Sequence, residues 1–133
     1  MSLIVDTNVL IRAITLDDPT ESRKSLEILR APSVVISSQA LCEMIWVLRR
    51  LYRRTHTELV AVVNFLVETE NLVLDRPAVE AGLLCMEAGG DFADGIIAFE
   101  GRRLGGEVFA TFDRKAASIL AKAGHSVQLL ASD

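Results

Sequence analysis

The chain has 133 residues, 50% of them hydrophobic, a mean hydropathy of +0.34 and a formal net charge of −4. A chain of this length buries roughly 68% of its unfolded surface, so its core needs no disulfide or metal to hold it together. The hydrophobic fraction excludes a disordered chain. The acidic balance excludes a global attraction to nucleic acid, so any such binding must come from a local basic patch or from bound metal ions.

Cysteines, histidines and apolar runs narrow the class of protein further. Cys42 and Cys85 form no CxxC pair and are interpreted as small hydrophobic residues of a protein in the reducing cytoplasm. His56 and His125 are isolated, which argues against a zinc site. The first apolar run has no basic segment before it, and the richest later run is far shorter than the roughly 18 residues of a membrane span. Neither a signal peptide nor a membrane partner is expected.

Short β-rich runs alternate with helical patterns along the whole chain. Strands are expected at residues 3–6, 34–37, 71–75, 107–111 and 126–130. Helices are expected from near Asn8 and over residues 20–31, 37–54, 57–69, 77–90, 91–106 and 113–124. Because nearly all-apolar strands between helices are typical of a covered parallel sheet, the pattern predicts an α/β fold. The predicted architecture is a single domain over residues 1–133, with a central parallel sheet of about five strands and helices on both faces.

The first strand is interrupted within "LIVDTNVLIRAI", where Asp6, Thr7 and Asn8 break an apolar run. One interpretation is a strand followed by a helix that Asp6 or Thr7 caps. The alternative is a carboxylate needed for chemistry, since ligands of parallel α/β folds bind beyond the carboxyl ends of the strands. Asp6 ends the first strand and Asp113 follows the fourth, so both are expected at that edge.

Each acidic residue has a plain structural explanation when it is considered alone. Asp91 and Asp113 stand where helix N-caps belong, Asp94 suits a first helical turn, and Glu43 lies away from the apolar stripe of its helix. As a set they need compensation, because two like charges 4 Å apart repel by about 4 kcal/mol at an effective dielectric constant of 20. Ligands that offer only oxygen suit Mg²⁺ or Mn²⁺ rather than zinc.

Four blocks of sequence carry a family resemblance. "DTNVL", "CEMIWVL", "DFADGIIA" and "TFDRK" occur in this order, and the chain resembles the PIN-domain nucleases from residue 1 to about residue 130. The nearest branch is that of the VapC-type toxins of toxin–antitoxin pairs. From the residues alone, Asn8 and Thr111 are expected to hold the carboxylates in place. The resemblance implies an acidic metal-binding and catalytic pocket, with a less certain place for Asp91 as a further acid or only a helix cap. The four pocket residues would be Asp6, Glu43, Asp94 and Asp113. Gly95 departs from the family pattern, in which Ala is more usual.

The resemblance also implies an activity and partners. It implies hydrolysis of RNA phosphodiester bonds through water activated by Mg²⁺ or Mn²⁺, a homodimer, and inhibition by a small VapB-like antitoxin. The alternative is a PIN fold that binds RNA or proteins without turnover, although a non-catalytic protein has no reason to keep four mutually repelling acids. A phosphoacceptor domain of the receiver type is a more distant alternative, because no strand here ends in the Lys that such domains carry.

The helix that carries Glu43 ends in four arginines. Steps of four, three and four residues from Glu43 reach Val47, Arg50 and Arg54, which predicts a stripe along which RNA phosphates bind. The alternative is a solvated helix end whose arginines suit the helix dipole. Trp46 lies off the apolar stripe and is either a second buried contact or a partly exposed contact for the dimer or the antitoxin.

Overall fold

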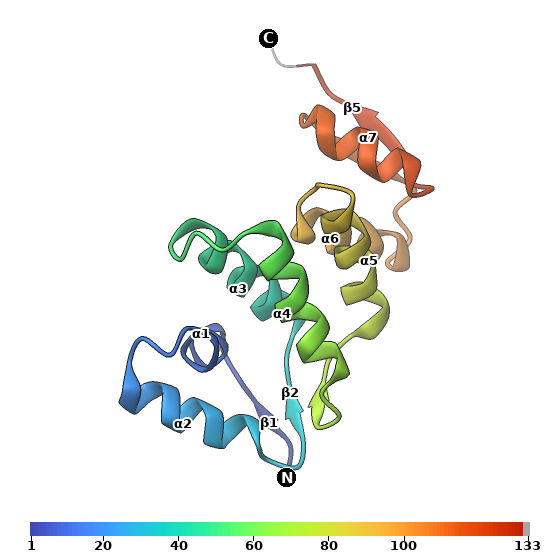
Figure 1. Ribbon diagram of the computed structural model, residues 1–133. Helices are drawn as coiled ribbons and strands as arrows, with labels where there is room; N and C mark the ends of the chain where they lie inside the picture. Colours follow the sequence, from blue (N-terminus) through green and yellow to red (C-terminus); the bar gives the residue numbers. More distant parts are fainter. Residues whose placement is uncertain (132–133) are drawn as a thin grey trace. The chain divides into compact units, whose positions relative to one another are not determined.

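The computed structural model describes residues 1–131 as seven helices and five strands, and every pair of strands is parallel (Figure 1). The predicted α/β class is therefore confirmed. The chain forms two compact units, Met1–Asp75 and Arg76–Asp133. A single domain over residues 1–133 stays a prediction, and its last two residues lie outside the described part.

The first unit contains a three-stranded parallel sheet in the order β1 (Leu3–Ile4), β2 (Val34–Val35), β3 (Leu72–Val73). Parallel neighbours need long crossover connections, and here each connection is a pair of helices. The first pair is α1 (Thr7–Thr15) and α2 (Pro19–Leu29), and the second is α3 (Ser38–Arg50) and α4 (His56–Glu68). The core side chains are aliphatic and fully or nearly fully buried. They include Leu10, Val34, Leu41, Met44, Leu48, Leu59 and Val63.

Local sequence signals decide where these helices begin. Asp18 caps α2, with Pro19 at the first helical position, and Ser37 caps α3. The fourth helix starts earlier than the sequence pattern suggested, because Thr55 and Glu58 form a reciprocal capping box.

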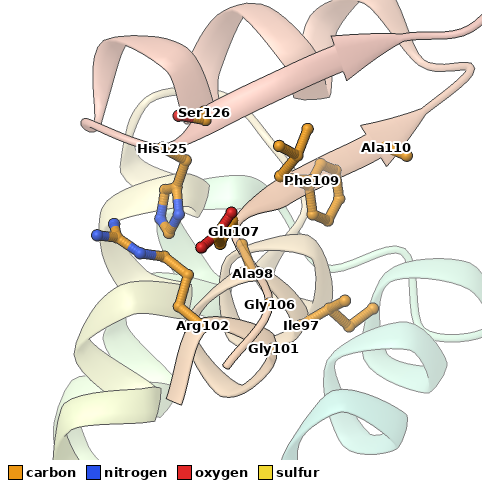
Figure 2. Close-up of a pocket in the computed structure, with 11 residues that line it drawn as sticks. Ile97, Ala98, Gly101, Arg102, Gly106, Glu107, Phe109, Ala110, His125 and Ser126 are labelled. Carbon is orange, nitrogen blue, oxygen red and sulfur yellow. The ribbon is translucent and has the colours of Figure 1, made fainter. Parts of the chain in front are cut away.

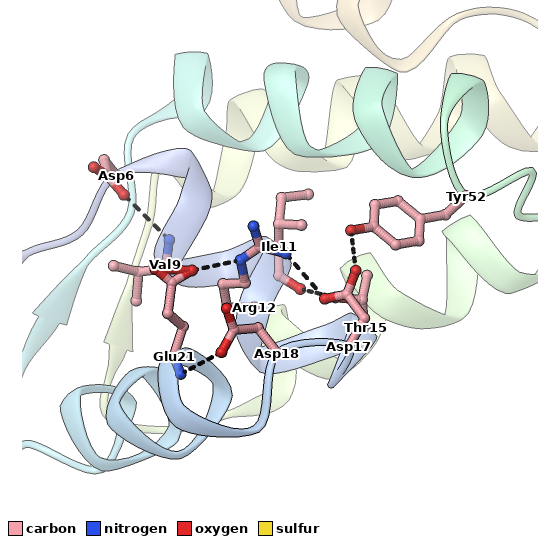
Figure 3. Close-up of polar contacts among 9 residues, drawn as sticks. All are labelled: Asp6, Val9, Ile11, Arg12, Thr15, Asp17, Asp18, Glu21 and Tyr52. Atoms are coloured by element: carbon pink, nitrogen blue, oxygen red, sulfur yellow. Dashed lines mark hydrogen bonds and ion pairs between the residues drawn. The ribbon is translucent and has the colours of Figure 1, made fainter.

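A polar network joins the α1–α2 turn to the segment after α3 (Figure 3). Asp17 accepts hydrogen bonds from Tyr52 Oη at 2.7 Å, Thr15 Oγ1 at 2.9 Å and Arg12 Nη1 at 3.0 Å. The Tyr52 and Thr15 hydroxyls and the Arg12 guanidinium hold the pKa of the Asp17 carboxyl below its usual value. Arg12 also pairs with Glu21 of α2 at 2.9 Å. The contact between Asp17 and Tyr52 therefore fixes the loop that follows the arginine-rich end of α3.

The second unit combines a helix pair with a small sheet. The pair is α5 (Arg76–Glu87) and α6 (Phe92–Arg103), and β4 (Val108–Thr111) pairs in parallel with β5 (Ser126–Leu129) across α7 (Arg114–Lys122). Helices α5 and α6 pack closely, and Phe92, the first residue of α6, is fully buried. Cys85, Ala98 and Leu120 form a buried cluster on which Phe109 and Val127 pack.

The five predicted strands are all present, but the structure assigns them to two sheets of three and two strands. Each sheet belongs to one unit, because β1, β2 and β3 pair with one another in the first unit and β4 pairs with β5 in the second. Within residues 1–131, no helix combines the length and the apolar character needed to cross a membrane.

Candidate functional site

Asp6 lies directly after β1, at the start of α1. Its Oδ1 accepts a hydrogen bond from the backbone N–H of Val9 at 3.1 Å, so Asp6 and not Thr7 is the N-cap of α1. The cap occupies only one carboxylate oxygen, because no hydrogen bond to Oδ2 is formed among the described residues. Asp6 is exposed, and its second oxygen is therefore available to a ligand.

Glu43 is held beside this strand end by Thr7, which the sequence suggested only as a possible helix cap. Thr7 Oγ1 donates a 2.6 Å hydrogen bond to Glu43 Oε2, across 36 residues of sequence, and Gln39 Nε2 donates to Oε1 at 3.3 Å. The Thr7 hydroxyl, and to a smaller extent the Gln39 amide, hold the pKa of the Glu43 carboxyl below its ordinary value. Glu43 is exposed, as its helical position indicated, and the packing of α1 on α3 brings it to Thr7, the residue that follows Asp6.

Asn8, which the sequence suggested as a positioning residue, has an exposed side chain without a hydrogen bond in the described part of the chain. Thr7 makes the contact in its place. The sequence near Thr7 shows only a hydroxyl group beside Asp6, because its partner Glu43 is 36 residues away.

Asp91 and Asp94 lie at the beginning of α6. Asp91 caps the helix, with its Oδ1 accepting from the backbone N–H of Ala93 at 2.9 Å. Asp94 is half-buried one turn later. Burial, and then the negative charges of Asp91 and Asp113, raise the pKa of the Asp94 carboxyl. Three acidic groups of the second unit therefore interact, and the most buried of them has a carboxylate that a nearby cation would stabilise.

Asp113 lies two residues after β4 and caps α7. Its Oδ1 accepts from the backbone N–H groups of Lys115 at 2.9 Å and Ala116 at 3.1 Å. The Thr111 hydroxyl contacts the backbone of this turn and not the carboxylate, because it accepts a hydrogen bond from the backbone N–H of Asp113 at 3.0 Å. As for Asp6, only one carboxylate oxygen of Asp113 accepts a hydrogen bond among the described residues.

The chemistry of these side chains fits a hard divalent cation. The acids offer only oxygen, and the capping acids Asp6, Asp91 and Asp113 each keep one carboxylate oxygen without a protein partner within residues 1–131. In that same part of the chain, no three side chains of His, Cys, Asp or Glu already form a metal-binding cluster. Two of the four predicted pocket acids belong to each unit, Asp6 and Glu43 to the first and Asp94 and Asp113 to the second.

We expect Asp94→Asn to stabilise the metal-free protein at neutral pH. The pKa of Asp94 is raised in the folded state, so its ionisation opposes folding above that pKa and has no effect below the pKa of the unfolded chain, about 3.9. The advantage of the variant should therefore be present at pH 7 and vanish as the pH falls below about 4. Denaturant unfolding in EDTA at both pH values measures this difference.

Glu80→Gln is the matched control, because Glu80 is an exposed acid on α5 of the same unit. Its stability should equal that of the native protein at both pH values. A large loss of stability in Asp94→Asn would instead mark Asp94 as a structural hydrogen-bonding group.

The arginine stripe predicted on α3 is only partly correct. Glu43, Val47 and Arg50 share the helix, but α3 ends at Arg50, and Arg53 turns the chain with a φ of 52°. Arg54 therefore leaves the stripe and pairs with Glu58 of α4 at 3.7 Å. Trp46 is 57% exposed, which excludes the interpretation of a second buried contact.

A separate hollow of about 250 Å³ lies in the second unit (Figure 2). The end of α6, the start of β4 and the segment before β5 line it, and Arg102, Glu107 and His125 are its charged or titratable residues. Burial, and then the positive charge of Arg102, lower the pKa of His125. None of the acids considered above lines this hollow, so it is not part of the predicted site.

The sequence is similar to one known family. The family model for the PIN domain matches residues 3–122. No curated protein matches the sequence. PIN domains are commonly nucleases and generally depend on a divalent metal, and the acids described above offer only oxygen atoms. With a match over nearly its whole length, the chain belongs to the PIN-domain family.

Proposed function

We propose that this protein is a divalent-metal-dependent endoribonuclease and the toxin of a type II, VapBC-like toxin–antitoxin pair. One observation carries the proposal: acids at the positions of the PIN motifs are fixed by hydrogen bonds and still keep carboxylate oxygens free. Asp94 caps no helix and lies near the charges of Asp91 and Asp113, which a protein that used its acids only as helix caps would not need.

In this proposal Asp6, Glu43, Asp94 and Asp113 hold Mg²⁺ or Mn²⁺. The cation, when bound, activates water and neutralises charge on the phosphate. Thr7 and Gln39 orient the Glu43 carboxylate, and the backbone N–H groups of α1 and α7 orient those of Asp6 and Asp113. Asp91 keeps α6 in place and adds negative charge near Asp94. One of these carboxylates takes the proton released from water, since the motifs contain no histidine.

The test is RNA cleavage by the purified protein. We expect a structured RNA to be cut in the presence of Mg²⁺ or Mn²⁺, and cutting to stop when EDTA is added. Asp6→Asn should keep the α1 cap, because Asn caps helices about as well as Asp, and should lose cleavage. Undiminished cutting by Asp6→Asn would remove Asp6 from the ligands, and cutting in EDTA would contradict metal dependence.

The proposal includes a homodimer, a VapB-like antitoxin as partner and action in the cytoplasm, where the RNA substrate lies. Light scattering of the purified protein tests the dimer. A short open reading frame for a DNA-binding protein beside the gene would support the antitoxin, and loss of cleavage on adding its product would test inhibition.

A further inference from the structure

We infer that Trp46 and Arg50 form a platform for one nucleotide of single-stranded RNA, in which the base stacks on the indole and Arg50 contacts a phosphate. This inference rests on the proposed function, because it assigns a place to the RNA beside the acidic residues. It also specifies that the bound segment is single-stranded, since a base within a duplex has no free face to stack on a side chain.

The platform lies on the same face of α3 as Glu43. Residues three, four and seven positions apart are neighbours along one face of a helix, so Glu43, Trp46 and Arg50 follow one another. With a rise of 1.5 Å per residue, Trp46 lies about 4.5 Å and Arg50 about 10.5 Å along the helix axis from Glu43. A nucleotide on the platform would therefore be close to the Glu43 carboxylate.

The indole and the guanidinium are already arranged for this contact. The Cζ atom of Arg50 lies 5.5 Å from the centroid of the Trp46 ring, within the range of a cation–π interaction. Met44, Ile45 and Leu48 supply the buried stripe of α3, so the core does not use Trp46. The ring is exposed and the Arg50 guanidinium lies over it, so an aromatic surface and a phosphate-binding group are presented together.

Three arginines on α3 and just after it have no acidic partner among the described residues. Arg49, Arg50 and Arg53 form no ion pair within residues 1–131, whereas Arg12 and Arg54 are paired with acids. Arg49 lies three positions after Trp46 and flanks it together with Arg50. In a protein with a net charge of −4, this segment is a local basic patch of the kind that binds phosphates.

The neighbours of Trp46 favour RNA over a protein partner. A protein interface centred on a tryptophan is expected to be apolar around it. Here the positions three and four residues from Trp46 on α3 include the exposed Glu43 and Arg50 and the half-buried Arg49. An isolated aromatic face bordered by arginines is the combination that single-stranded nucleic acids bind, through stacking and backbone contacts.

The single tryptophan of the sequence makes the platform directly observable. Protein in EDTA is titrated with an oligoadenylate of eight nucleotides, and with an abasic ribose-phosphate oligomer of the same length and charge. We expect oligoadenylate to quench the Trp46 emission to saturation and to bind about tenfold more tightly than the abasic oligomer. Equal affinities without quenching would overturn the inference.

Variants separate stacking from charge when binding is followed by the anisotropy of labelled oligoadenylate. Trp46→Ala should weaken binding about tenfold, and Trp46→Phe should restore most of it. Phe65→Ala is the matched control, because Phe65 of α4 is 69% exposed and lies outside the platform. Arg50→Ala should reduce the slope of log K against log salt by about 0.7, the value for one phosphate contact of a single strand. Arg23→Ala, an exposed arginine of α2, should leave the slope unchanged.

The outcomes distinguish this inference from the proposed nuclease. Metal-dependent cleavage without quenching of Trp46 would reject the platform and keep the nuclease. Quenching and stacking without cleavage in Mg²⁺ or Mn²⁺ would keep the platform and reject the nuclease. If the emission changes on dilution of the protein and RNA has no effect on it, Trp46 contacts a second copy of the chain, and the platform is rejected.

Discussion

Asp113→Asn should abolish RNA cleavage while leaving the fold intact. An asparagine Oδ1 can accept the same two hydrogen bonds, from the backbone N–H groups of Lys115 and Ala116, that now cap α7. The substitution removes the negative charge and replaces the second carboxylate oxygen by an amide group, which is a poor ligand for Mg²⁺. We expect cleavage to fall by about a hundredfold or more, since even residues that only support metal ligands change activity by 10–100-fold.

The Asp113→Asn variant should lose cleavage but keep the stability of the native protein. The free energy of unfolding of Asp113→Asn should stay within about 0.5 kcal/mol of the native value, and Asp113→Ala should lose about 1 kcal/mol more, because alanine cannot cap. Asp18→Asn is the matched control: Asp18 caps α2 through the N–H of Glu21 at 3.1 Å and is not one of the proposed ligands. It should retain full cleavage. Native activity in Asp113→Asn would limit Asp113 to capping.

Gly95→Ala should destabilise the protein by roughly 1–3 kcal/mol, the usual cost of forcing an extra methyl group into a closely packed site. A Cβ at position 95 would lie 2.5 Å from the carbonyl oxygen of Ala81 and 2.9 Å from Cα of Gly82. Both atoms belong to the backbone of α5, so a side-chain rotation cannot relieve the contact and the two helices must separate. Urea unfolding measures the loss.

Gly101→Ala on the same helix provides the matched control. Apart from its chain neighbours and the backbone of its own helix, no described atom lies within 4 Å of a Cβ at position 101, so alanine should bring only its higher helix propensity, a gain of up to about 1 kcal/mol. Equal stabilities of the two variants would contradict the close approach of α5 and α6. Because Gly95 follows Asp94, separation of the helices should also displace that carboxylate, and cleavage by Gly95→Ala should fall.

Much of this fold could be predicted from the sequence because its signals are local. Alternation of apolar strands with helical patterns gave the α/β class and all five strands, and aspartates before helices gave the caps at Asp91 and Asp113. These signals act within about four residues, the reach of a capping hydrogen bond or of one helical turn. The order of the four acidic blocks likewise needs no tertiary information, and it led to the same family as the match over residues 3–122.

Other features depend on residues that are far apart in sequence, and only the tertiary structure decided them. The bond between Thr7 and Glu43 joins two helices across 36 residues, and helical periodicity alone had left Glu43 on the surface without a partner. Gly95 departs from the family pattern, and only the structure shows that the close approach of α5 requires a residue without a side chain there. Arg54 was assigned to the stripe of Arg50 because a helical pattern does not reveal where Arg53 reverses the chain. In each case the deciding contact comes from another element, and a pattern within one element contains no information about it.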